Sequence, residues 1–266
     1  MTTTTKDGAQ IDYAVMGEGE PALLLCPAWC MSRNGFAHVP ERLVDKHRVI
    51  QLDWRGHGAS PLPSEDFGAD QLVEDALAVI EASGVQSVIP VTLSHAGWVA
   101  IELEKRLGKE RVPKIINLDW VVLPPPPMYM DLVHALASPE GWEGARDVLF
   151  GMWLEGVTDQ EEISFVRDEM GGVSGEMWQR SGREIGNSIE KGGYPLAALA
   201  QLDPPVPTIH IYAQPPDQGY YEAQVDFGKA NPWFHVHRLS AHSHFPTFEM
   251  PDEIAATIEE FVAQDS

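Results

Sequence analysis

Cysteine is almost missing from this sequence of 266 residues, which contains only Cys26 and Cys30. Two cysteines so close together cannot build a disulfide framework or supply the four ligands of a structural zinc site, so we expect two reduced thiols. Basic residues are also few, because 18 Lys and Arg face 40 Asp and Glu and give a net charge of −22. This charge repels nucleic-acid phosphates and anionic membrane surfaces, and therefore favours a small-molecule partner.

Long apolar runs are absent as well. Neither the Thr-rich N-terminus nor any later stretch has the basic flank and apolar core of a signal peptide, or the roughly 20 apolar residues of a membrane span. We therefore expect a cytoplasmic protein that does not enter a membrane. With 44% hydrophobic residues the chain can still bury a substantial core. The residues leave the number of subunits open.

Short apolar segments of strand length recur along the chain and alternate with helical patterns. These segments are Ala22–Cys26, Val49–Leu52, Val88–Leu93, Lys114–Leu118, Thr208–Tyr212 and Phe234–Leu239. The alternation predicts an α/β protein with a mostly parallel central sheet flanked by helices. The stretch up to about Val15 is typical of a hairpin at the sheet edge. Pro90 removes a ladder hydrogen bond inside one strand, so we expect a bulge there.

The alternation stops after Leu118. Four consecutive prolines, Pro124 to Pro127, open a range rich in Met, Trp and helical patterns but without strand-like runs. We predict a helical cap at 124–203, inserted between two parts of the core at 1–123 and 204–266. The Met and Trp side chains of the cap can cover an apolar pocket or fill the cap's own core.

A candidate nucleophile elbow follows the strand that ends at Leu93. Ser94 lies between that strand and a helical pattern, although Thr92 and Ala96 replace the two glycines of the usual G-x-S-x-G motif. The segment Asp53–Ser60 ends another strand with the pattern D-x-R-G-x-G-x-S. Together with a histidine near the C-terminus, these features predict the α/β-hydrolase fold.

That histidine is His244, which follows the last predicted strand and precedes a terminal helix. Its place after the serine fits the chain order of this fold. His242, His235 and His237 compete for the role, the latter two as alternating residues of a strand. His242 and His244 with Glu249 also resemble a two-histidine, one-carboxylate iron site, which is an alternative interpretation of these residues.

An acidic residue must orient His244. Asp217 follows the penultimate predicted strand, and Asp119 follows the strand before it, so the residues alone leave both open. The loop after the first core strand occupies the position that supplies an oxyanion-hole donor, and we expect the amides of Trp29 and His95 to be the two donors. This constellation predicts a serine esterase or amidase, with a non-catalytic ligand-binding protein as a further alternative.

Six stretches carry a more specific signal over nearly the whole chain. They are Pro27–Cys30, Asp53–Gly58, Leu93–Trp98, Asp119-Trp120, Leu149–Leu154 and His244-Phe245-Pro246. In these stretches the chain resembles the cofactor-free 2,4-dioxygenases of 3-hydroxy-4(1H)-quinolones, a branch of the α/β-hydrolase fold. The resemblance implies that His244, aided by Asp119, takes the proton of the substrate 3-hydroxyl, while Ser94 binds the substrate without attacking it. The anion then reacts directly with O2, without metal or flavin, and yields carbon monoxide and an N-acylanthranilate.

The resemblance also implies that Trp29, Trp153 and the amide of His95 surround the heteroaromatic substrate. Two positions depart from the family, since members acting on the 2-methyl substrate carry histidines where this chain has Met31 and Leu93. A more apolar pocket suits a longer 2-alkyl chain. The expected substrates are therefore O2 and 2-heptyl-3-hydroxy-4(1H)-quinolone, a quorum-sensing signal.

Overall fold

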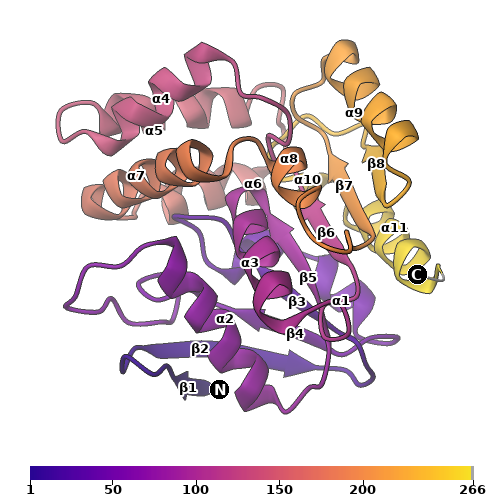
Figure 1. Ribbon diagram of the computed structural model, residues 1–266. Helices are drawn as coiled ribbons and strands as arrows, with labels where there is room; N and C mark the ends of the chain where they lie inside the picture. The colour runs from indigo at the N-terminus through magenta and orange to yellow at the C-terminus, as the bar shows by residue number, and fades with distance from the viewer. Residues whose placement is uncertain (265–266) are drawn as a thin grey trace.

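The structure is a computed structural model that describes residues 1–264, so the last two residues of the predicted core segment 204–266 lie outside it. Its centre is a sheet of eight strands in the order β1-β2-β4-β3-β5-β6-β7-β8 (Figure 1). The strands are β1 (Thr2–Thr4), β2 (Gln10–Met16), β3 (Ala22–Cys26), β4 (Val49–Leu52), β5 (Val88–Leu93), β6 (Ile115–Leu118), β7 (Thr208–Tyr212) and β8 (Phe234–Arg238). Strand β1 pairs antiparallel with β2, and β2 pairs antiparallel with β4, while all other neighbours pair in parallel. Both the parallel sheet and the N-terminal hairpin are thus confirmed.

All six predicted core strands form, and only Lys114 and Leu239 fall outside their bounds. The bulge predicted at Pro90 is wrong, because Leu24 pairs with Pro90 in an unbroken one-to-one register. The ladder between β5 and β6 begins only at Val91. The proline precedes that ladder, so its missing N–H leaves the pairing of β5 with β6 intact.

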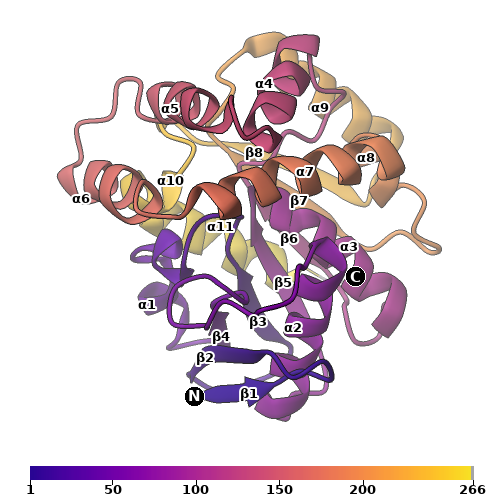
Figure 2. The same cartoon turned by 90° about the vertical axis from the view of Figure 1, so that its left-hand side faces the viewer.

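Helices cover both faces of the sheet, with α1 and α11 on one side of the strands and α2 and α3 on the other (Figure 2). The helices outside the long insertion are η1 (Arg33–Phe36), α1 (Val39–Leu43), α2 (Ala69–Ser83), η2 (Ser94–Ala96), α3 (Gly97–Leu107), α9 (Gln218–Ala230), α10 (Pro246–Glu249) and α11 (Pro251–Ala263). Helix α2 shows why they form. It buries an apolar face that includes Leu72 and Val79, and Gly84 ends it with a left-handed φ of 70°.

Between β6 and β7 the described chain forms helices and no strand. They are α4 (Pro127–Ala137), α5 (Trp142–Trp153), α6 (Gln160–Ser164), η3 (Phe165–Met170), α7 (Gly175–Gly192) and α8 (Pro195–Leu199). Helices α4, α5 and α7 form a layer above one edge of the sheet (Figures 1 and 2). Trp178 is buried inside this layer, whereas Met128 and Met152 are exposed.

The two cysteines and the lengths of the helices bear on two further expectations from the sequence. Cys26 and Cys30 are unpaired and buried, as expected for reduced thiols. Within residues 1–264, no helix combines the length and the apolar character that crossing a membrane requires.

Candidate active site

The candidate residues lie at the carboxyl ends of parallel strands, which meet at one edge of the sheet. Ser94 follows β5, Asp119 follows β6, and His244 lies in the loop between β8 and α10. Only four non-glycine residues of the described chain have positive φ, and Cys30, Ser94 and Asp119 are three of them, at 62°, 49° and 44°. Such strained backbone costs free energy and gathers at functional sites. The strain therefore marks this edge as the candidate site.

The elbow keeps one glycine that it needs. A Cβ on Gly97 would lie 2.2 Å from the ring of Trp120, so helix α3 can approach the β6 loop only with glycine there. Thr92 and Ala96 are buried and small enough for the same close packing. This explains how the degenerate motif still forms a tight turn at Ser94.

His244 and Asp119 form the central pair of the site. The Nδ1 of His244 lies 2.8 Å from Oδ1 of Asp119. The other carboxylate oxygen accepts hydrogen bonds from the amides of Ala213 at 2.6 Å and Gln214 at 3.2 Å. The side chain of Asp119 is 1% exposed and that of His244 is 13% exposed. A carboxylate held in this way fixes the imidazole orientation and leaves Nε2 of His244 available to take a proton.

The loop that carries Asp119 is fixed by neutral side chains. The amide of Trp120 donates to Nε2 of His210 at 3.1 Å, and Nδ1 of His210 donates to Gln224 at 2.6 Å. Burial lowers the pKa of His210 to about 4, which keeps its Nε2 free to accept. The hydroxyl of Tyr220 donates to the Trp120 carbonyl at 3.2 Å. The loop is thus held from β7 and from α9.

Ser94 is not hydrogen-bonded to His244 in the described chain. Its Oγ lies 3.2 Å from Nδ1 of His95, whose Nε2 lies 3.0 Å from the hydroxyl of Tyr129. Burial lowers the pKa of His95 to about 3, and the proximity of His244 adds to the effect. His95 is therefore neutral, and the serine faces a histidine different from the one that Asp119 orients.

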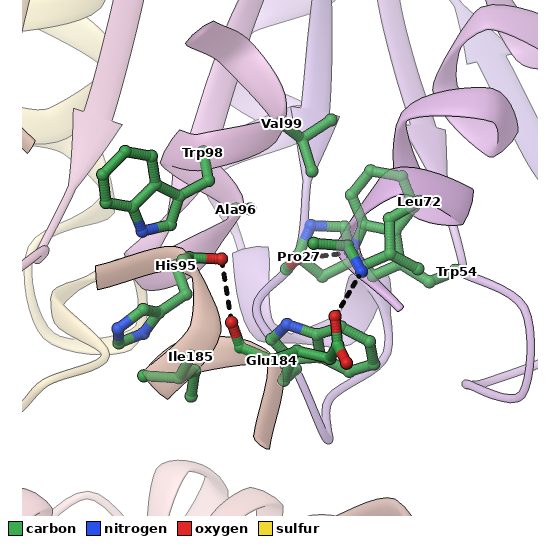
Figure 3. Close-up of a pocket in the computed structure, with 12 residues that line it drawn as sticks. Pro27, Trp54, Leu72, His95, Ala96, Trp98, Val99, Glu184 and Ile185 are labelled. Carbon is green, nitrogen blue, oxygen red and sulfur yellow. Dashed lines mark hydrogen bonds between the residues drawn. The ribbon is translucent and has the colours of Figure 1, made fainter. Parts of the chain in front are cut away.

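Aromatic rings surround the pair. Trp153 of α5 stacks on His244, with ring centroids 5.1 Å apart and an interplanar angle of 16°. Trp29 stacks on Phe67, with ring centroids 6.0 Å apart, and lines a small cavity. His95 lines the same cavity (Figure 3). The amides of Trp29 and His95 donate to no other residue in the described chain, so both are free to bind an oxyanion.

Two predicted pocket residues, Met31 and Leu93, do not line the small cavity that contains Trp29 and His95. Met31 and Leu93 are fully buried, and the end of the Met31 side chain packs so closely on Gly35 that a Cβ there would clash with it. Their contact with a substrate stays a prediction. Asp217, the other acidic candidate, caps α9 by accepting the Tyr220 amide at 2.8 Å.

The alternative iron site does not assemble. His242 pairs with Glu249 at 3.2 Å, whereas His244 pairs with Asp119. No group of three or more His, Cys, Asp or Glu side chains in residues 1–264 is arranged to hold a metal ion.

The sequence did not point to Tyr129, His57 or Glu162. Tyr129 lies just after the proline run with no motif around it. His57 belongs to the D-x-R-G-x-G pattern at a variable position, and its Nε2 accepts the amide of Cys30 at 3.0 Å, which fixes the loop that follows Trp29. Glu162 lies on α6, fully buried, and neither carboxyl oxygen has a hydrogen-bond partner in the described chain.

Glu162 provides a test of stability against pH. Burial raises the pKa of Glu162 from 4.5 to about 8, an interaction with Ser243 opposes this, and Glu249 and Asp159 add to it. Because folding raises the pKa of Glu162, the contribution of this residue to the free energy of unfolding is fully present below about pH 4.5 and is lost as the pH rises through 8. Between pH 5 and pH 9, we expect the free energy of unfolding of the parent to fall by about 2 kcal/mol more than that of Glu162→Gln.

Urea unfolding of both proteins at the two pH values measures this difference. Glu155→Gln, at an exposed glutamate of the same insertion, is the matched control and should show no such change. A Glu162→Gln effect that is the same at pH 5 and pH 9 would contradict the expectation.

Comparison with known proteins agrees with the fold and identifies the family. A family model described as the alpha/beta hydrolase family matches residues 23–257, and the chain belongs to that family. It is 33% identical to a 2-heptyl-3-hydroxy-4(1H)-quinolone dioxygenase of Mycobacteroides abscessus over 96% of both chains. It is 34% identical to a 1H-3-hydroxy-4-oxoquinoline 2,4-dioxygenase of Pseudomonas putida over 98% of this chain and 99% of the other.

A solved structure of an AqdC variant with its substrate, the Pseudomonas quinolone signal, superposes with a TM-score of 0.94. Its sequence is 32% identical, and the match covers 99% of this chain and 98% of that one. Within the α/β hydrolases, the chain thus belongs to the quinolone dioxygenases.

Proposed function

We propose that the protein is a cofactor-free dioxygenase that cleaves the heterocyclic ring of 2-alkyl-3-hydroxy-4(1H)-quinolones with O2. The observation that supports this most is the pairing of His244 with Asp119 while Ser94 faces His95. A serine esterase needs its histidine beside the serine as general base. Here His244 is free to act on a ligand, and the relatives named above are quinolone dioxygenases.

In this mechanism, Nε2 of His244 takes the proton of the 3-hydroxyl, and Asp119 stabilises the imidazolium. The electron-rich anion reacts with O2 to give a peroxide at C2, which attacks C4. Ring opening releases C3 with its own oxygen as carbon monoxide, and both atoms of O2 remain in the N-acylanthranilate. The product leaves as its carboxylate anion, and the proton held by His244 is released to solvent. The amides of Trp29 and His95 would stabilise the developing oxyanions.

We further propose that 124–203 acts as a cap over the core formed by 1–123 and 204–266. The stacking of Trp153 on His244 supports this, because Trp153 belongs to the insertion and His244 to the core. A cap that excludes water strengthens the electrostatic interactions of the base pair. We also propose a preference for 2-heptyl over 2-methyl substrates, which rests on the sequence alone, because Met31 and Leu93 stand where members acting on the 2-methyl substrate carry histidines.

An aerobic assay tests the function. Purified protein with a chelator present is given 2-methyl and 2-heptyl substrates, and ring loss, O2 consumption and carbon monoxide release are recorded. We expect one O2 consumed and one carbon monoxide released per ring cleaved, with a higher kcat/KM for the 2-heptyl compound. Hydrolysis of p-nitrophenyl esters without O2 consumption would show a serine esterase. Tight binding without turnover in air would show a binding protein.

A further inference from the structure

Two hydrogen bonds join the helical insertion to the strained serine turn. The hydroxyl of Tyr129, on α4, lies 3.0 Å from Nε2 of His95, and Nδ1 of His95 lies 3.2 Å from Oγ of Ser94. The rings of His95 and Tyr129 are nearly parallel, at 11°, with centroids 6.4 Å apart. The three side chains form one continuous chain of polar groups that ends at the site, and the mechanism above gives Tyr129 no role.

The number of protons limits how this chain can be arranged. A neutral imidazole has one N–H donor and one lone pair, so one ring nitrogen of His95 donates and the other accepts. Either Tyr129 donates to Nε2 and Nδ1–H donates to Ser94, or both bonds run in the opposite direction. A phenol is a stronger acid than an aliphatic hydroxyl and hence the better donor. The first arrangement is therefore favoured.

This arrangement decides what Ser94 can do. If Nδ1–H of His95 donates to Oγ, one lone pair of the serine oxygen is occupied and no base is placed to remove its proton. The hydroxyl hydrogen of Ser94 has no acceptor in the described chain and is free for a ligand. Ser94 is then a hydrogen-bond donor and a poor nucleophile.

We propose that Tyr129 is a positioning residue that acts through His95 to direct the hydroxyl of Ser94 at an oxygen of the bound substrate. Hydrogen bonds in a chain polarise one another, so the hydroxyl of Ser94 becomes a stronger donor when its oxygen accepts a hydrogen bond from His95. A stronger donor gains most from an anionic acceptor. The partner is therefore the anionic oxygen of the deprotonated hydroxyquinolone, and for the identity of this ligand the inference rests on the proposed function.

A double-mutant cycle of Tyr129→Phe and Ser94→Ala tests the relay. The probe is 2-heptyl-3-hydroxy-4(1H)-quinolone, with its Kd measured without O2 and its KM and kcat measured in air. We expect Tyr129→Phe, which keeps the ring stacking, to raise Kd and KM by about 3- to 10-fold and to change kcat less. In the Ser94→Ala background, Tyr129→Phe should have no further effect.

Tyr194→Phe is the matched control, since Tyr194 is a half-buried tyrosine of the same insertion and should leave Kd and KM unchanged. Equal effects of Tyr129→Phe in the parent and in Ser94→Ala would overturn the relay, as would an unchanged Kd and KM. Parent protein that binds the quinolone but consumes no O2 would overturn the proposed function alone, because the binding cycle remains readable. A parent protein that does not bind it would overturn both.

Discussion

Replacing His244 with alanine should lower kcat/KM for a 3-hydroxy-4-quinolone by on the order of 10³-fold. The reason is the loss of the general base, whose contribution to a proton transfer is of that size. Asp119 cannot substitute, because its carboxylate is 1% exposed and its oxygens are occupied by His244 and two backbone amides. Steady-state O2 consumption under saturating and limiting substrate measures the loss.

Two controls separate base catalysis from damage to the loop. His242→Ala removes an exposed histidine two residues away that pairs with Glu249, and we expect its kcat/KM to stay within about 2-fold of the parent. The absorption spectrum of the anaerobic complex should show the substrate anion with the parent protein and the neutral substrate with His244→Ala. Equal losses in the two alanine variants would indicate that the loop fold, and not the base, sets the rate.

The strands in the middle of the sheet could be predicted because they are buried on both faces. Every residue of β3 and β5 is buried, so β3 appears in the sequence as an uninterrupted apolar run and β5 as a run in which only Thr92 is polar. The same logic located Ser94, which directly follows β5. The bulge predicted at Pro90 was wrong because the sequence does not show that the ladder between β5 and β6 begins one residue after this proline.

The partner of His244 could not be chosen from the residues alone. Asp119 and Asp217 both follow strands, and the difference lies in the backbone. Asp119 adopts a φ of 44° that turns its carboxylate towards the amides of Ala213 and Gln214, while Asp217 faces the first turn of α9. Only the family resemblance favoured Asp119 beforehand, and its role as the orienting acid remains a prediction.

The contact of Tyr129 with His95 was equally hidden. The two residues are 34 positions apart, and Tyr129 belongs to an insertion that pairs with no strand. Sheet topology brings the ends of parallel strands together, but the packing of an inserted helix depends on side-chain shape. The part of the site contributed by the insertion therefore had no sequence signal other than the resemblance at Trp153.

Replacing Asp119 with asparagine should lower kcat/KM by about 10²- to 10⁴-fold with little change in substrate Kd. The carboxylate accepts three hydrogen bonds, two from backbone amides and one from Nδ1 of His244. An asparagine has one carbonyl oxygen, and when that oxygen accepts the hydrogen bonds of the two backbone amides, its NH2 group faces His244. The histidine must then accept at Nδ1 and carry its proton on Nε2, which can no longer take a proton from the substrate.

Rapid-quench measurement of ring cleavage together with anaerobic Kd values tests this. Asp217→Asn, which changes the acid at the start of α9, is the matched control and should leave kcat/KM within about 2-fold. Because Asp119 acts through His244, adding Asp119→Asn to His244→Ala should cause almost no further loss. If the two losses multiply instead, Asp119 contributes by a route other than His244, and its assignment as the residue that orients the base is wrong.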